Sequence, residues 1–81
     1  MPLYYFDLRD DDKFVPDEEG TELSSIDEVQ NEAAYALADM LSEQLRAANG
    51  HGLARDLIIE VRDSGGAVMR ARFAFEIERL Q

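Results

Sequence analysis

The sequence predicts an α+β fold in which one helix packs on one face of an antiparallel sheet of three or four strands. Residues 25–48 carry apolar side chains at steps of three and four, which is the period of an amphipathic helix. Residues 3–9 and 69–77 alternate apolar and polar side chains, which is the period of a strand with one buried face. Shorter strand patterns at 13–15 and 57–61 complete the order β-β-α-β-β.

The chain before the helix is expected to form a strand, a turn, a short strand and a second turn. Residues 3–9 have one strongly apolar face, and the consecutive aspartates at 10–12 predict the first turn. Residues 13–15 are expected to form the short strand, because the proline that follows them favours a strand end. Residues 17–20 predict the second turn, with Gly20 free to adopt positive φ.

The predicted helix has clear start and stop signals. Ser25 and Glu28 fit a capping box, in which a hydroxyl and a carboxylate each accept a hydrogen bond from a free backbone N–H group. Acidic residues in the first turn suit the positive end of the helix dipole. Asn49 and Gly50 predict the helix end, because both tolerate the left-handed conformation that follows a last turn. The apolar stripe expected to face the sheet comprises Ile26, Val29, Ala33, Ala36, Leu37, Met40, Leu41 and Ala48.

The predicted hairpin of residues 57–61 and 69–77 has a register that its side chains dictate. A two-residue loop would mix core and solvent faces, whereas a three-residue loop at 64–66 keeps the faces apart. The longer loop also sets Glu60 opposite Arg70, which is a favourable cross-strand pair. Its last glycine then takes the left-handed conformation that is common at that position. The expected apolar neighbours are Val61 with Met69, Ile59 with Ala71, and Leu57 with Phe73.

The four predicted strands are expected to lie in the spatial order second, first, third, fourth. The connection from the second strand to the third then passes the first strand and can be right-handed. Residues 57–61 are central in this order, in keeping with the apolar Ile58 on their outer face. Residues 1–81 are expected to form one α+β domain.

The chain carries a net charge of −10, and its acidic groups are unevenly distributed. Residues 1–45 hold 13 acidic and 2 basic side chains, whereas residues 46–81 hold 5 acidic and 6 basic ones. Phosphate backbones repel such a protein, so no nucleic-acid partner is expected. A basic protein would be attracted to it, although solubility alone also explains the charge.

The composition also bears on where the protein acts. No apolar run approaches membrane-spanning length, so no membrane partner is expected. The first residues become acidic too early for a secretory signal, which favours the cytoplasm. The chain has no cysteine, so disulfides and thiolate metal sites are not available to it.

Few side chains offer catalytic chemistry. His51 is the only histidine and lies between two glycines, but Arg55 stands where the dinucleotide-binding motif G-x-G-x-x-G needs its third glycine. A glycine-flanked loop also holds a catalytic histidine poorly. The acidic residues between 10 and 19 lack the spacing of a calcium-binding EF-hand. They are therefore expected either to form solvated turns or to bind a metal or small molecule weakly. No catalytic, cofactor-binding or metal-binding residue is predicted, and we expect the protein not to be an enzyme.

The sheet face away from the helix is a possible interaction surface. It mixes apolar and arginine side chains, and either solvent or a second chain covers it. A symmetric homodimer is the commonest way to cover such a face. Tyr35, on the polar side of the helix, is either an exposed tyrosine or an anchor for a partner. The residues of this possible surface on the sheet are Tyr5, Ile58, Arg62, Arg70 and Arg72.

Three stretches carry a family resemblance, namely MPLYYFD at residues 1–7, PDEEGTEL at 16–23 and IEVRD at 59–63. With them, nearly the whole chain resembles a family of small uncharacterised alphaproteobacterial proteins that is classed as a domain of unknown function. The resemblance implies a bacterial origin and brings no known activity, ligand or catalytic residue. A weaker resemblance is to HicB-type antitoxins, which also run from a strand through P-D-x-E-G to a helix and a strand.

Taken together, these observations predict a non-enzymatic protein-interaction module. Its expected partner is a second copy of itself, in a homodimer, or an unidentified protein. The resemblance to HicB-type proteins implies an alternative function, that of an antitoxin-like partner of a basic toxin. A weak metal-binding or small-molecule-binding protein is a further alternative, with the acidic turns as its site.

Overall fold

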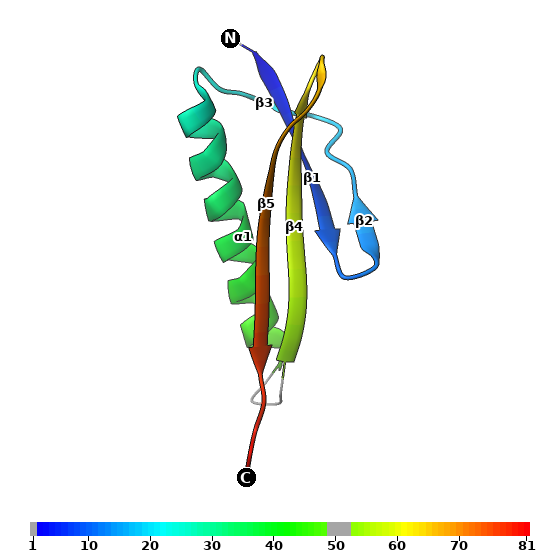
Figure 1. Cartoon of the computed structure of the whole chain (residues 1–81), viewed down its shortest axis with the longest axis vertical. Coiled ribbons are helices and arrows are strands. Elements are labelled where there is room, and N and C mark those ends of the chain that lie inside the picture. Colours follow the sequence, from blue (N-terminus) through cyan, green and yellow to red (C-terminus); the bar gives the residue numbers. More distant parts are fainter. Residues whose placement is uncertain (1, 49–52) are drawn as a thin grey trace.

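The computed structural model describes residues 2–48 and 53–81, and in them the chain forms one helix and five strands (Figure 1). The α+β class and the order of the predicted elements are confirmed. The structure adds one short strand, Thr21–Glu22, three residues before the helix. The elements are β1 (Leu3–Asp10), β2 (Lys13–Val15), β3 (Thr21–Glu22), α1 (Ile26–Ala48), β4 (Leu53–Asp63) and β5 (Gly66–Ile77).

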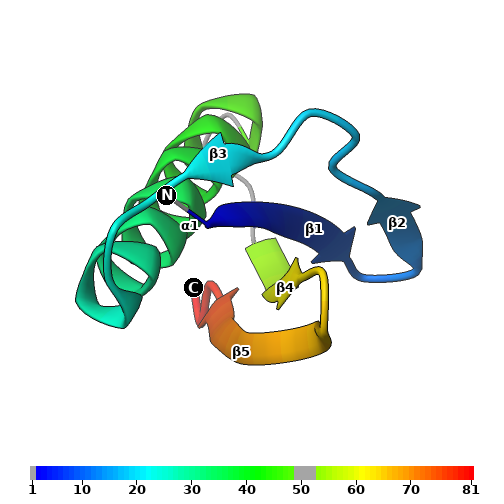
Figure 2. The same cartoon turned by 90° about the horizontal axis from the view of Figure 1, so that it is seen from above.

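The strands form an antiparallel sheet in the order β2-β1-β4-β5, which confirms the predicted spatial order. The short β3 pairs with the start of β1 and lies on the opposite side of β1 from β4 (Figure 2). The helix α1 runs along one face of the sheet and contacts β4 and β5 (Figure 1). The other face of the sheet carries no helix from the described part of the chain.

The hydrophobic core lies between α1 and the central strand β4. Its members come from one face of α1, from alternate positions of β4 and from the start of β1. Each fully buried valine, leucine or isoleucine stabilises the fold by about 1.5–3 kcal/mol, so this cluster is the main source of stability. The buried residues of the cluster are Tyr4, Val29, Ala33, Leu37, Leu57, Ile59 and Val61.

The helix α1 begins with the predicted cap. The N–H of Glu28 donates a hydrogen bond to Ser25 Oγ, with an N–O distance of 3.2 Å. The Glu28 carboxylate accepts a second bond from the N–H of Ser24 at 2.8 Å, one residue earlier than the capping box predicts. The middle of the apolar stripe is buried, but Ile26 in the first turn is 48% exposed. The predicted helix end at residues 49–50 lies outside the described residues.

The hairpin of β4 and β5 has the predicted register but not the predicted loop. Glu60 lies opposite Arg70, and the three predicted apolar pairs are also formed. However, Asp63 pairs with Gly66, so the loop has two residues, Ser64 and Gly65. The prediction of a three-residue loop is therefore wrong.

A β-bulge reconciles this short loop with the register. Arg62 lies opposite Ala67 whereas Val61 lies opposite Met69, so Val68 is an extra residue on β5. Such an insertion shifts the pairing by one residue and returns each side chain to its proper face. Continuous pairing of the two strands would require the extra residue to lie in the loop, which is why the side-chain pattern predicted three loop residues.

The strand β4 begins at Leu53, earlier than the predicted residue 57. Residues 54–56 are Ala, Arg and Asp, none of which favours a strand by itself, so the pattern was too weak to predict this part. Arg55 Nε donates to Gln44 Oε1 at 2.8 Å, and Gln44 Nε2 donates to Asp10 Oδ2 at 3.1 Å. These hydrogen bonds join β4, α1 and β1 near the end of the helix.

Candidate functional site

Asp7 of β1 is a buried carboxylate, only 8% exposed, on the sheet face away from α1. Its Oδ1 accepts a hydrogen bond from the backbone N–H of Asp17 at 2.9 Å, and its Oδ2 accepts one from Arg62 Nε at 2.8 Å. Arg62 Nη2 also donates to the carbonyl oxygen of Asp17 at 3.1 Å. The guanidinium carbon of Arg62 lies 4.4 Å from the centroid of the Tyr5 ring. We call Tyr5, Asp7, Asp17 and Arg62 the Asp7 network.

The Asp7 network draws on three separate parts of the chain. Tyr5 and Asp7 share a face because side chains alternate along β1, and Arg62 lies opposite Tyr5 in the pairing of β1 with β4. Asp17 comes from the turn between β2 and β3. Each of the three stretches that carry the family resemblance thus supplies part of one network. The sequence predicted Tyr5 and Arg62 as surface residues on this face, whereas neither aspartate was predicted to belong to a site.

The carboxylate of Asp17 takes the place of a neighbouring strand along part of β1. The strand β1 pairs with β3 near its start and with β2 near its end, which leaves Phe6 between the two. The N–H of Phe6 donates to Asp17 Oδ2 at 3.1 Å. Asp17 Oδ1 accepts hydrogen bonds from the N–H groups of Glu19 at 3.1 Å and Gly20 at 3.2 Å. One side chain therefore satisfies the strand edge and shapes the turn.

Gly20 completes this turn with a φ of +76°, in the left-handed region. A Cβ atom there would lie 3.0 Å from Leu3 Cγ and 3.0 Å from Tyr5 Cε1, so the site also lacks room for a side chain. The predicted turn and the positive φ of Gly20 are confirmed. The view of Asp17 as a solvated acid is wrong, because its carboxylate holds three backbone N–H groups.

The stability that Asp17 provides is expected to depend on pH. Burial raises the pKa of its carboxyl, but three backbone N–H groups and the Arg62 guanidinium together hold that pKa below 3.8. Ionised Asp17 therefore stabilises the fold above the unfolded pKa, and this contribution is lost as the pH falls through the folded pKa. We expect Asp17→Asn to lower the free energy of unfolding at about pH 6 and to lower it much less at about pH 3. Urea denaturation followed by circular dichroism measures both differences, and a pH-independent difference would contradict this assignment.

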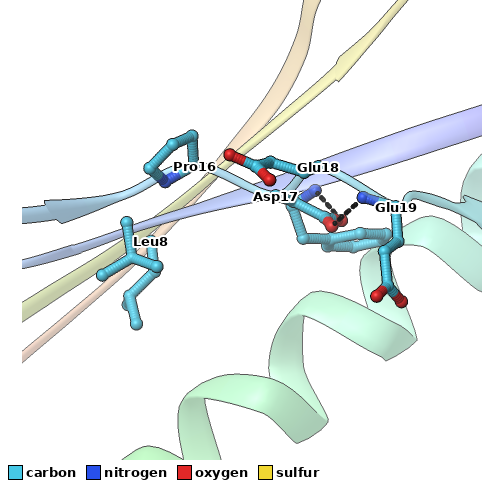
Figure 3. Close-up of a pocket in the computed structure, with 7 residues that line it drawn as sticks. Leu8, Pro16, Asp17, Glu18 and Glu19 are labelled. Carbon is cyan, nitrogen blue, oxygen red and sulfur yellow. Dashed lines mark hydrogen bonds between the residues drawn. The ribbon is translucent and has the colours of Figure 1, made fainter.

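An open pocket of about 410 Å³ lies beside β1 and β2, where the loop after β2 runs alongside β1 (Figure 3). Its floor is apolar, and its rim carries the acidic side chains of Asp17, Glu18 and Glu19. The Asp17 carboxylate is already engaged with backbone N–H groups. The lining offers no hydroxyl, thiol or imidazole to act as a nucleophile or base. The residues around the pocket are Phe6, Leu8, Val15, Pro16, Asp17, Glu18 and Glu19.

The predicted interaction surface lies together on the sheet face away from α1, but its arginines are paired. Arg70 Nη2 lies 3.3 Å from Glu60 Oε2, and Arg72 makes two hydrogen bonds to Asp56 at 3.0 and 2.7 Å. Arg62 belongs to the Asp7 network. The charges of this face are therefore largely matched within the chain. The residues that the structure brings together here are Tyr5, Ile58, Arg62, Arg70 and Arg72.

Tyr35 does not belong to that surface. It lies on α1 and is 67% exposed, whereas the sheet face in question is on the opposite side of the molecule from the helix. Exposed acids such as Glu32 and Asp39 surround it in sequence on the outer side of α1. The structure thus separates the two places that the sequence proposed for a partner.

The strand β5 forms an edge of the sheet. It pairs with β4 on one side, and no described strand lies along its other side (Figure 2). It is 12 residues long, contains no proline, and leaves most of its side chains exposed. Phe73 and Ile77, on the helix side of β5, are 38% and 43% exposed. Sequence reasoning placed this strand last in the sheet but did not recognise its open edge as a site.

Residues 2–48 and 53–81 include no group of three or more side chains placed to hold a metal ion. His51 and the glycines beside it lie outside the described residues. In the described part of the chain, no helix has both the length and the apolar character needed to cross a membrane.

Comparison with known proteins identifies a family but no activity. A family model described as a domain of unknown function (DUF6894) matches residues 3–74. The matched range runs from β1 into β5 and includes the whole Asp7 network. No curated protein and no solved structure matches the chain.

Proposed function

The chain belongs to this family of domains of unknown function (DUF6894), and from that premise we propose that it is a non-enzymatic protein-interaction module. The proposed binding site is the open edge of β5 with the arginine side chains beside it. The observation that carries this proposal is the 12-residue length of an edge strand whose side chains are mostly exposed. Exposed strand edges of this kind accept a strand from another chain.

The unpaired edge of β5 offers backbone N–H and C=O groups to a partner. Proteins commonly protect such an edge with proline, a very short strand, or a covering helix or loop. The strand β5 has none of these three protections, and the helix α1 covers only one face of the sheet (Figures 1 and 2). The strand does carry two other features of protected edges, a bulge at Val68 and the charged side chains of Arg70, Arg72 and Glu76, but residues 69–77 beyond the bulge are in regular strand pairing with β4. A partner strand would therefore meet an accessible row of hydrogen-bonding groups.

The side chains next to the edge support binding of a protein. Arg70 and Arg72 have side chains that remain 65% and 62% exposed although each is paired with an acidic side chain of β4. Phe73 and Ile77 add exposed apolar surface on the other face. Arginine and aromatic side chains are enriched at protein interfaces.

The proposal of a non-enzymatic role is supported by what the most unusual side chains do. Asp7 is buried and accepts hydrogen bonds from Asp17 and Arg62, and the Asp17 carboxylate holds the edge of β1. Both carboxylates thus have a structural role. Although Asp17 lines the pocket, its carboxylate accepts hydrogen bonds from three backbone N–H groups.

Photo-crosslinking in cells tests the proposed site. A photoreactive amino acid at Ala74, which is exposed on β5, is expected to give a crosslinked adduct with another polypeptide. The same group at Tyr35, which is exposed on α1, is the matched control and is expected to give none or far less. Adducts at position 35 but not at position 74 would overturn the proposal and move the site to the helix. No adduct at either position would also count against it.

A second candidate function is that of an antitoxin-like partner of a basic toxin. The charge distribution favours it, because residues 1–45 hold 13 acidic and only 2 basic side chains. A small basic ribonuclease encoded beside this protein would support this function, and a solitary gene would count against it.

A further inference from the structure

We propose that the strand received at the β5 edge is β5 of a second copy of this chain, paired antiparallel about a two-fold axis at Phe73. This inference rests on the proposed function, because it names the partner at the same edge. In this register the sequence of β5 is complementary to itself on both faces of the sheet.

The charged face of β5 supports this register. When two copies pair about Phe73, Arg70 lies opposite the partner's Glu76, and the two-fold axis repeats this pair. Arg70 already lies 3.3 Å from Glu60 on its other side, so a row of alternating charges would cross the interface. In the single chain, Glu76 lies opposite Ala54 and has no basic neighbour on β4.

The apolar face of β5 supports the same register. Pairing about Phe73 sets Phe73 opposite the partner's Phe73 and Met69 opposite the partner's Ile77. It also sets the small Ala71 opposite the large ring of the partner's Phe75. Side chains alternate along a strand, so the odd-numbered residues of both copies lie on the helix side of the joined sheet. The rings and methyl groups that are exposed in the single chain would then be covered between the two helices.

Neighbouring registers are less favourable. An axis at Arg72 sets that arginine opposite itself, and an axis at Ala71 sets Arg70 opposite the partner's Arg72. An axis at Ala74 sets Arg72 opposite the partner's Glu76, but Asp56 holds Arg72 by two hydrogen bonds, whereas Glu60 holds Arg70 by only one, at 3.3 Å. That axis also requires residues beyond Ile77, where β5 ends, to pair with Arg70. The axis at Phe73 keeps all of residues 69–77 within the strand.

Analytical ultracentrifugation of charge variants tests this inference at physiological ionic strength, where distant charges between the two acidic chains are screened. The molar mass measured for the wild-type protein is expected to be twice the 9.2 kDa of one chain. Glu76→Arg would bring two pairs of arginines together, so we expect the dimer to dissociate about tenfold or more readily. Adding Arg70→Glu to Glu76→Arg exchanges the charges across the interface and is expected to recover part of the lost dimer, because the new carboxylate also faces Glu60 of its own chain. Glu32→Arg makes the same change of charge on the outer side of α1, away from the β5 edge, and is the control, with no expected effect.

Different results would overturn the register, the identity of the partner, or the proposed function as well. Rescue of Glu76→Arg by Arg72→Glu, but not by Arg70→Glu, would place the axis at Ala74 and overturn the register. The wild-type chain could also stay monomeric in the ultracentrifuge while position 74 crosslinks to a different protein. That result would overturn the inference that the partner is a second copy, and it would leave the proposed function standing. A monomer with no crosslink at position 74 would overturn both. Circular dichroism of each variant shows whether the chain is folded, and Glu76 is exposed, so its replacement should not disturb the fold.

Discussion

Replacing Asp17 with alanine is expected to lower the free energy of unfolding by about 3 kcal/mol. The substitution removes the acceptor for the N–H groups of Phe6, Glu19 and Gly20. The N–H groups of Phe6 and Gly20 lie in part-buried surroundings, and a hydrogen bond to a charged acceptor there contributes about 1.5 kcal/mol or more. Urea denaturation of wild type and variant at neutral pH measures the difference.

Glu18→Ala is the matched control for this prediction. Glu18 is the exposed neighbour of Asp17, and no hydrogen bond of its side chain is found in the described structure. Its replacement is expected to change the free energy of unfolding by less than about 0.5 kcal/mol. If the two alanine variants were equally stable, the carboxylate of Asp17 would not hold the edge of β1 in solution.

Replacing Leu57 with alanine is expected to lower the free energy of unfolding by about 2–5 kcal/mol. Leu57 is fully buried in the core between β4 and α1, so the substitution removes apolar contacts and leaves a cavity. A chain of this length has a free energy of unfolding of about 5–10 kcal/mol, so we expect a large fall in the midpoint of thermal unfolding. Circular dichroism at increasing temperature measures that midpoint.

Leu80→Ala removes the same atoms from an exposed position. Leu80 is 86% exposed beyond the end of β5, and its replacement is expected to change stability by no more than about 0.5 kcal/mol. Equal effects of the two leucine substitutions would mean that the cluster between α1 and β4 is not the core of the protein.

Local patterns in the sequence were enough to predict most of the fold. The steps of three and four in α1 and the alternation in β1 and β5 repeat over several residues, so each element is signalled many times. The pairing of Glu60 with Arg70 followed from the need to keep apolar residues on one face. The order of the strands followed from the handedness of the connection between β2 and β4.

The parts that were missed depend on few residues or on distant ones. The strand β3 has two residues and no alternation to detect. The bulge at Val68 satisfies the same side-chain pattern as a longer loop, so the pattern alone does not distinguish the two. Asp7 and Arg62 are 55 positions apart, and neither residue signals by itself that the other is its partner. An aspartate within an aromatic strand, followed by P-D-x-x-G, is the signal that could have indicated a buried carboxylate.

The two edges of the sheet differ in a way that limits how many chains can join. Beyond β1 lie only the three residues of β2, the two residues of β3 and the Asp17 carboxylate, so that side offers no long stretch of free backbone. In a dimer formed at β5, the partner strand would occupy the one extended edge of each chain in the described structure. Growth into a filament would need a second such edge, and this architecture would therefore terminate assembly at two subunits.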